Sequence, residues 1–167
     1  MGSRMNVDYF MNEALLEAKK AFTFNEIPIG AVIVDNISNE IISRNYNQVN
    51  KSNNAINHCE IDLIYRTCKL LKKKYLDNMT MFVTLEPCTM CASAISEAHI
   101  NTLYFGAYDE KKGGIEKLRL AFKRENIFMP NIYGGIMEKK CSDIIKEFFK
   151  TVRWIIRLTY QNMKYQN

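Results

Sequence analysis

The chain has 167 residues, enough for one domain with a sizeable core, and 47% of them are hydrophobic, as in most globular proteins. No apolar run reaches the roughly 18 residues of a membrane span, and five cysteines without an apolar signal region argue against a disulfide scaffold. The formal net charge of +5 suits a polyanionic partner without requiring one. We therefore expect a cytoplasmic protein in a reducing compartment, with no membrane association.

Apolar and polar residues alternate with the periods of helices and strands in turn along the chain. The two strands around the turn at 36–39 form a hairpin, and Pro130 places the weak last strand at a sheet edge. We expect one domain over 1–167 with three α/β/α layers around a five-stranded mixed sheet. The expected order is helix 7–24, strands 29–34 and 40–45, helix 58–75, strand 79–85, helix 88–98, strand 100–106, helix 115–124, strand 127–133 and helix 138–160.

The two ends of the chain carry separate expectations. Residues 1–4 are expected to be an addition ahead of a natural start at Met5. Residues 154–167 are expected to form a C-terminal helical tail that begins with an apolar Trp-Ile-Ile run. This tail could pack on the body, cover a dimer edge or fray.

The segment from Thr84 to Cys91 gives the clearest chemical signal. An apolar, β-branched run ends at Pro87, and a helix-like segment begins at Cys88. Proline suits the opening of a helix, where its missing N–H is not needed. Cys88 and Cys91 stand three apart, so one helical turn places both sulfurs on one face. A helix N-terminus favours thiolates, and two thiolates are half of a tetrahedral zinc site.

The chain offers only two histidines to complete such a site. His58 stands in the motif His58-Cys59-Glu60, where the expected helix 58–75 begins. Residues two apart share no helix face, so His58 and Glu60 converge only if the motif lies in the first turn. We predict that His58, Cys88 and Cys91 hold Zn²⁺ with a water, and that Glu60 lies beside the metal. The Cys59 side chain is expected to point away from it.

This set of residues predicts hydrolytic deamination of a nucleobase. Two thiolates and one imidazole neutralise zinc and leave a Lewis acid with an open position. Such a site can lower the pKa of water to about 7, and Glu60 could pass the proton to a ring nitrogen and then to the leaving amine. His-x-Glu followed by Pro-Cys-x-x-Cys is the signature of the zinc nucleobase deaminases. A lone Cys-x-x-Cys would fit a redox pair or a structural zinc equally well.

With both motifs placed, the chain resembles the bacterial tRNA-specific adenosine deaminases from about Tyr9 to Arg153. The resemblance implies a cytidine-deaminase-like fold, a homodimer, one Zn²⁺ per subunit and conversion of wobble adenosine to inosine in a tRNA anticodon stem-loop. It also implies that Asn47 would hydrogen-bond the target nucleotide and that the backbone near Cys59 and Pro87 would border the base. The similar segments are Glu26–Val32, Asn47, His58–Glu60, Thr84–Cys91, Phe105–Ala107 with Asp109 and Lys111, Gly135-Ile136 and Phe148-Phe149.

From the residues alone, Asn47 remains open between a turn former in an Asn-rich loop over 45–57 and an amide projected over the site. By the resemblance, Asp109 and Lys111 are the remaining predicted substrate-binding residues. An RNA substrate would be gripped through its phosphates by basic residues around the pocket, and the target base would be flipped out. These basic residues are Lys111, Lys112, Lys150 and Arg153.

Two other functions compete with RNA editing. A deaminase of free cytosine, guanine or a nucleoside would use the same zinc chemistry. It is favoured by Asn57, where the family usually has a small residue, and by Phe128-Met129 in place of a His-Arg pair. Cys59, where the family has Ala, is a further departure from the family pattern. The near-complete match to the tRNA family favours RNA. A zinc-stabilised scaffold without activity would leave Glu60 with no task.

Overall fold

The computed structural model describes residues 5–115 and 127–164, with side chains described as far as residue 157. The expected helix 115–124 therefore lies outside the described residues apart from its first position. The described elements are α1 (Val7–Thr23), β1 (Gly30–Asp35), β2 (Ile41–Tyr46), α2 (Val49–Ser52), α3 (Cys59–Leu71), β3 (Met79–Leu85), α4 (Thr89–Glu97), β4 (Thr102–Ala107), β5 (Asn131–Tyr133) and α6 (Glu138–Lys164).

A five-stranded mixed sheet forms the centre of the molecule. Its strand order is β2-β1-β3-β4-β5, with β1 antiparallel to both of its neighbours and β3, β4 and β5 parallel. The expected hairpin is the β1–β2 pair, and the strand interrupted by Pro130 is an edge strand. The fold class expected from the sequence is confirmed.

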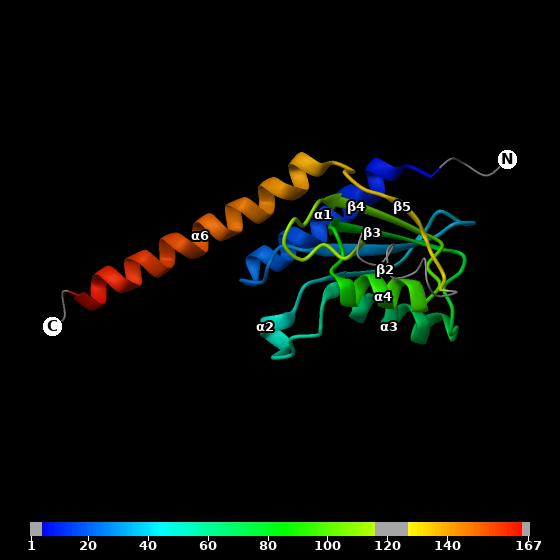
Figure 1. The fold of residues 1–167 in the computed structure, drawn as a ribbon, viewed down its shortest axis with the longest axis horizontal. Coiled ribbons are helices and arrows are strands. Elements are labelled where there is room, and N and C mark those ends of the chain that lie inside the picture. Colours follow the sequence, from blue (N-terminus) through cyan, green and yellow to red (C-terminus); the bar gives the residue numbers. More distant parts are fainter. Residues whose placement is uncertain (1–4, 116–126, 165–167) are drawn as a thin grey trace.

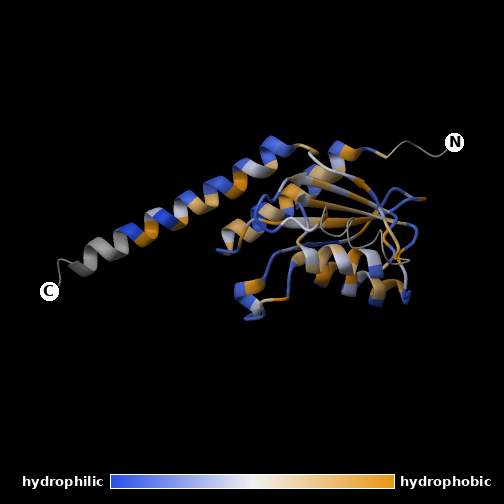
Figure 2. Cartoon of the chain, in the orientation of Figure 1, coloured by the Kyte–Doolittle hydropathy of each residue, from blue (hydrophilic) through white to orange (hydrophobic). Residues whose placement is uncertain are grey.

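Helices cover both faces of the sheet (Figure 1). Alternate residues of β1 point to opposite faces. Ala31 and Ile33 belong to the core shared with α3 and α4, whereas Val32 and Val34 belong to the core shared with α1 and α6. This two-sided burial explains why β1 reads as a continuous apolar run instead of an alternating one. Figure 2 shows the apolar residues gathered on the strands and the polar ones on the outer loops.

Gly30 allows α1 to lie directly on the start of β1. A Cβ at this position would lie 2.3 Å from both the Ala14 carbonyl oxygen and the Ala18 amide nitrogen of α1. No side chain fits in that space, because both atoms belong to helix backbone. The contact fixes where the chain leaves α1 and enters the sheet.

The elements differ from the sequence prediction in four places. The helix expected to reach residue 75 ends at Leu71, because Lys72 adopts a left-handed conformation with φ 52° and closes α3. The expected strand 127–133 is regular only over Asn131–Tyr133, beyond Pro130, which has no N–H to donate. The Asn-rich loop contains the short α2, and the last helix continues past residue 160 to Lys164.

The C-terminal part of α6 projects away from the sheet (Figure 1). Cys141 and Phe148 of its first half are buried against the body, whereas Trp154 is 62% exposed. The expected tail is thus a continuation of α6 as far as the structure describes it. Within the described ranges, no helix has the length and apolar character that crossing a membrane requires.

Candidate active site

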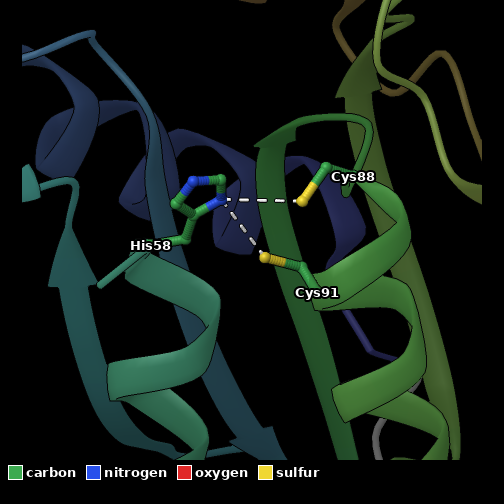
Figure 3. Close-up of side chains that lie close together, drawn as sticks. All are labelled: His58, Cys88 and Cys91. Carbon is green, nitrogen blue, oxygen red and sulfur yellow. Dashed lines mark hydrogen bonds between the residues drawn. The ribbon is translucent and has the colours of Figure 1, made fainter. Parts of the chain in front are cut away.

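His58 and Cys88 each stand at the position that precedes a helix. His58 is the N-cap of α3 and Cys88 the N-cap of α4, both in extended conformation. Neither side chain caps its own helix, so both are available for other contacts. The prediction that the two motifs open helices is confirmed. In Figure 3, His58 and the two cysteines point toward one another across the gap between α3 and α4.

The three side chains have the spacing of metal ligands. His58 Nδ1 lies 3.6 Å from Cys88 Sγ and 3.4 Å from Cys91 Sγ. Zinc–nitrogen bonds of about 2.1 Å and zinc–sulfur bonds of about 2.3 Å at a tetrahedral angle require a separation of about 3.6 Å between the donors. His58, Cys88 and Cys91 are the candidate metal cluster found within the described part of the chain. This donor set fits zinc.

Without metal, the cluster already favours a thiolate. Hydrogen bonds from Cys91 and His58 lower the pKa of Cys88 to about 3. The contact with Cys88 raises the pKa of His58, and it also raises the pKa of Cys91. Cys88 is therefore the ligand of this cluster that carries the negative charge. A cation entering the site would meet one ligand that is already deprotonated.

Glu60 lies in the first turn of α3 and is 4% exposed. It borders the same cavity as His58 and Cys88, and it does not belong to the candidate metal cluster. Burial raises the pKa of its carboxyl group. The Cys59 thiol donates to Glu60 Oε2 at 3.3 Å and is otherwise packed in the core, where it is 1% exposed.

A cavity of about 810 Å³ contains the site. Its size lies in the range of pockets for small ligands, about 300–1,000 Å³. Asn47, Asp109 and Lys111 line it, whereas Cys59 and Pro87 are buried and are not lining residues. The role expected for the backbone beside these two residues stays a prediction. The wall also includes Glu26, Ile27, Glu86, Tyr108, Ser142, Lys146 and Phe149, which the sequence analysis did not assign to the site.

One wall is a loop that Glu86 holds in place. Glu86 Oε2 accepts from the Asp109 N–H at 3.1 Å, and Oε1 accepts from the Ile115 N–H at 3.3 Å. Asp109 Oδ1 in turn accepts from the N–H groups of Lys111 and Lys112, both at 3.0 Å. The carboxylate next to the zinc motif thus organises the loop that presents Asp109 and Lys111.

Another part of the wall depends on a second carboxylate, Glu26, which is 1% exposed. Its two oxygens accept from the N–H groups of Asn50 at 3.2 Å and Lys51 at 2.7 Å, which fixes α2. Asn47 precedes α2 and is 4% exposed, with its N–H donated to the Ile29 carbonyl. Within the described residues, no partner is found for the Asn47 side-chain amide, which leaves it available in the cavity.

Comparison with known proteins assigns the chain to a family. The MafB19-like deaminase family matches residues 5–153. A tRNA-specific adenosine deaminase of Rickettsia bellii is 42% identical over 144 residues, which cover 86% of this chain and 99% of the relative. The tRNA-specific adenosine deaminase of Bacillus subtilis is 37% identical over 148 residues, 87% of this chain and 90% of the relative. The chain belongs to the tRNA-specific adenosine deaminase family.

Solved structures agree with this family. A structure from work on A-to-I editing by tRNA:A34 deaminases at the wobble position of transfer RNA has a TM-score of 0.75 and 39% identity, covering 81% of this chain and 98% of that one. A guanine deaminase from Nitrosomonas europaea has a TM-score of 0.73 over 89% of this chain and 85% of that one. At 15% identity, the second likeness concerns the fold alone.

Two of the positions that depart from the family pattern lie away from the cavity wall. Asn57 donates its N–H to the Asn54 carbonyl and is not a lining residue. Phe128 stacks on His99 with ring centroids 4.7 Å apart, and its carbonyl accepts from the Ser96 hydroxyl. Neither the Asn57 nor the Phe128 side chain forms part of the cavity wall as the structure describes it.

Proposed function

We propose that this protein is a zinc-dependent hydrolytic deaminase that converts the wobble adenosine of a tRNA anticodon to inosine. The observation that carries the proposal is one cavity that joins a three-donor cluster with zinc spacing to the buried Glu60. The relatives from Rickettsia bellii and Bacillus subtilis, both named tRNA-specific adenosine deaminases, support the substrate. A purely structural zinc site would not need a proton-carrying carboxylate such as Glu60 beside the metal.

His58, Cys88 and Cys91 would hold the zinc ion, which when bound supplies an activated water as nucleophile. Glu60 accepts the proton of this water at a carboxylate oxygen as the C6–O bond forms. Glu60 delivers this proton to the adenine ring nitrogen, then takes the remaining proton from the new C6 hydroxyl group and delivers it to the amine. The C6–N bond breaks and ammonia leaves, so that adenine and water become hypoxanthine and ammonia.

The cavity wall supports roles for the other predicted residues. The buried Asn47 amide would hydrogen-bond the target nucleotide, and the loop held by Glu86 would place Asp109 and Lys111 against it. The backbone beside Cys59 and Pro87 would border the base. Lys112 and Lys146 line the cavity, and α6 continues with further cations that would contact RNA phosphates, Lys150 and Arg153.

The remaining expectations are proposals as well. We propose a single deaminase domain over residues 1–167, a homodimer and a cytoplasmic location. The family match over 5–153 supports the extent of the domain up to the projecting part of α6. The positive net charge supports a polyanionic substrate such as tRNA.

The test is deamination of an anticodon stem-loop with adenosine at the wobble position by the zinc-loaded protein. Glu60→Ala serves as the control, because it should keep the three metal ligands and lose the proton carrier. Inosine formed by the wild type alone is the expected result. Ammonia released from free cytosine or guanine, with no inosine in the stem-loop, would refute the tRNA substrate while preserving the zinc chemistry.

A further inference from the structure

A stacked pair of aromatic rings, one exposed and one half-buried, lies beside the active-site cavity. The Phe24 and Tyr46 rings are stacked, with centroids 5.8 Å apart and an interplanar angle of 11°. Lys51 Nζ lies 5.7 Å from the Phe24 ring centroid. Phe24 is 59% exposed, so the ring contributes little to the core. We call Phe24, Tyr46 and Lys51 the aromatic platform.

Each member of the platform is held by fixed backbone. Phe24 closes α1, and its N–H donates to the carbonyls of Lys20 and Ala21. Tyr46 is the last residue of β2. The Lys51 N–H is held by the buried Glu26 at 2.7 Å. The rings are therefore preorganised at the surface, which lowers the entropic cost of binding a ligand.

The platform adjoins the cavity through neighbouring residues of the chain. Asn47, which lines the cavity, directly follows Tyr46, and consecutive Cα atoms are about 3.8 Å apart. Ile27, three residues after Phe24, and Asn50, which directly precedes Lys51, both line the cavity. The Asn50 side-chain amide donates to the Asn25 carbonyl. A nucleotide joined to one inside the cavity would thus meet the platform.

We propose that the aromatic platform is a stacking subsite for a nucleobase adjacent to the target adenosine in single-stranded RNA. This inference rests on the proposed function. Unpaired bases bind proteins by stacking on aromatic rings, and an ammonium beside the rings suits the neighbouring phosphate. A free base or nucleoside, confined to the cavity, would leave the platform unused.

The first experiment measures the affinity of full-length, zinc-loaded variants for the anticodon stem-loop. Loss of a base–aromatic stack should raise the Kd of Phe24→Ala roughly 5- to 150-fold. Phe24→Leu keeps the apolar bulk but not the ring and should bind as weakly, whereas Phe24→Tyr should restore binding. Tyr65→Ala is the matched control, because Tyr65 is 62% exposed, has Lys69 Nζ 6.0 Å from its ring centroid and does not line the cavity.

The second experiment removes the base from the RNA. Stem-loops with an abasic nucleotide on the 5′ or the 3′ side of the target adenosine are compared on wild type and Phe24→Ala. One of the two abasic stem-loops should bind the wild type more weakly than the intact stem-loop does. The Phe24→Ala substitution should then cause no further loss of affinity for that abasic stem-loop. Unchanged binding by Phe24→Ala, or an equal loss in Tyr65→Ala, would overturn the subsite. Absence of inosine from the wild type on every stem-loop would overturn the proposed function instead, whatever Phe24→Ala does.

Discussion

The substitution Glu86→Gln tests how the substrate-facing loop is held. Both carboxylate oxygens of Glu86 accept from backbone N–H groups, those of Asp109 and Ile115. Glutamine has nearly the same shape but only one accepting oxygen, and its NH₂ is a donor. Whichever way the amide turns, one of the two loop N–H groups faces another donor and loses its partner.

The expected cost follows from this count. A hydrogen bond to a charged group contributes about 1.5–3 kcal/mol, and the half-buried position of Glu86 places the loss near the lower figure. A change of about 1.4 kcal/mol is a factor of about ten in an equilibrium constant. We therefore expect the loop to open about tenfold more often, and kcat/KM for the stem-loop to fall by up to about tenfold. The zinc content should not change.

Hydrogen exchange at individual amides provides the assay. Amide exchange at Asp109, Lys111 and Lys112 should accelerate about tenfold in Glu86→Gln, while exchange at the core residue Leu63 stays as in the wild type. Glu97→Gln is the matched control, an exposed carboxylate at the end of α4. Unchanged exchange in the loop would refute the reasoning, and so would equal acceleration at Leu63, since that would mean global destabilisation.

Three further predictions concern the metal, the packing and the substrate. Cys91→Ala should lose bound zinc and activity, whereas Cys68→Ala, which lies outside the cluster, should keep both in metal analysis after dialysis. Gly30→Ala should lower the melting temperature by roughly 5–10 °C in calorimetry, because its Cβ would overlap the backbone of α1. Asn47→Ala should reduce kcat/KM for the stem-loop roughly 5- to 100-fold at an unchanged melting temperature.

The metal cluster could be predicted because its geometry is local. Cys88 and Cys91 are three apart at the start of one helix, and His58 and Glu60 occupy the start of another. Each pair is positioned by a single helical turn, so the spacing of its residues along the chain is enough to predict its geometry. The β1–β2 hairpin could be predicted for a related reason, because two strands joined by a short turn pair with each other in antiparallel fashion.

The cavity wall could not be predicted, because tertiary hydrogen bonds build it. Glu26 reaches Lys51 across 25 positions and Glu86 reaches Ile115 across 29. Nothing in the local sequence distinguishes these carboxylates from solvated ones. The end of α3 could not be predicted either. The apolar spacing of the helix continues beyond Lys72 and gives no sign that Lys72 adopts a left-handed conformation.

The proposed zinc ligands and the cavity wall therefore depend on different parts of the fold. His58 and Cys88 are fixed by the first turns of α3 and α4, which pack on the core. The residues proposed to contact the substrate lie on or next to segments held by Glu26 and Glu86, two carboxylates that line the cavity. Substitutions on those segments can change substrate preference without moving the metal ligands. A change of substrate in this fold would accordingly be sought beside Glu26 and Glu86, and not in the zinc motifs.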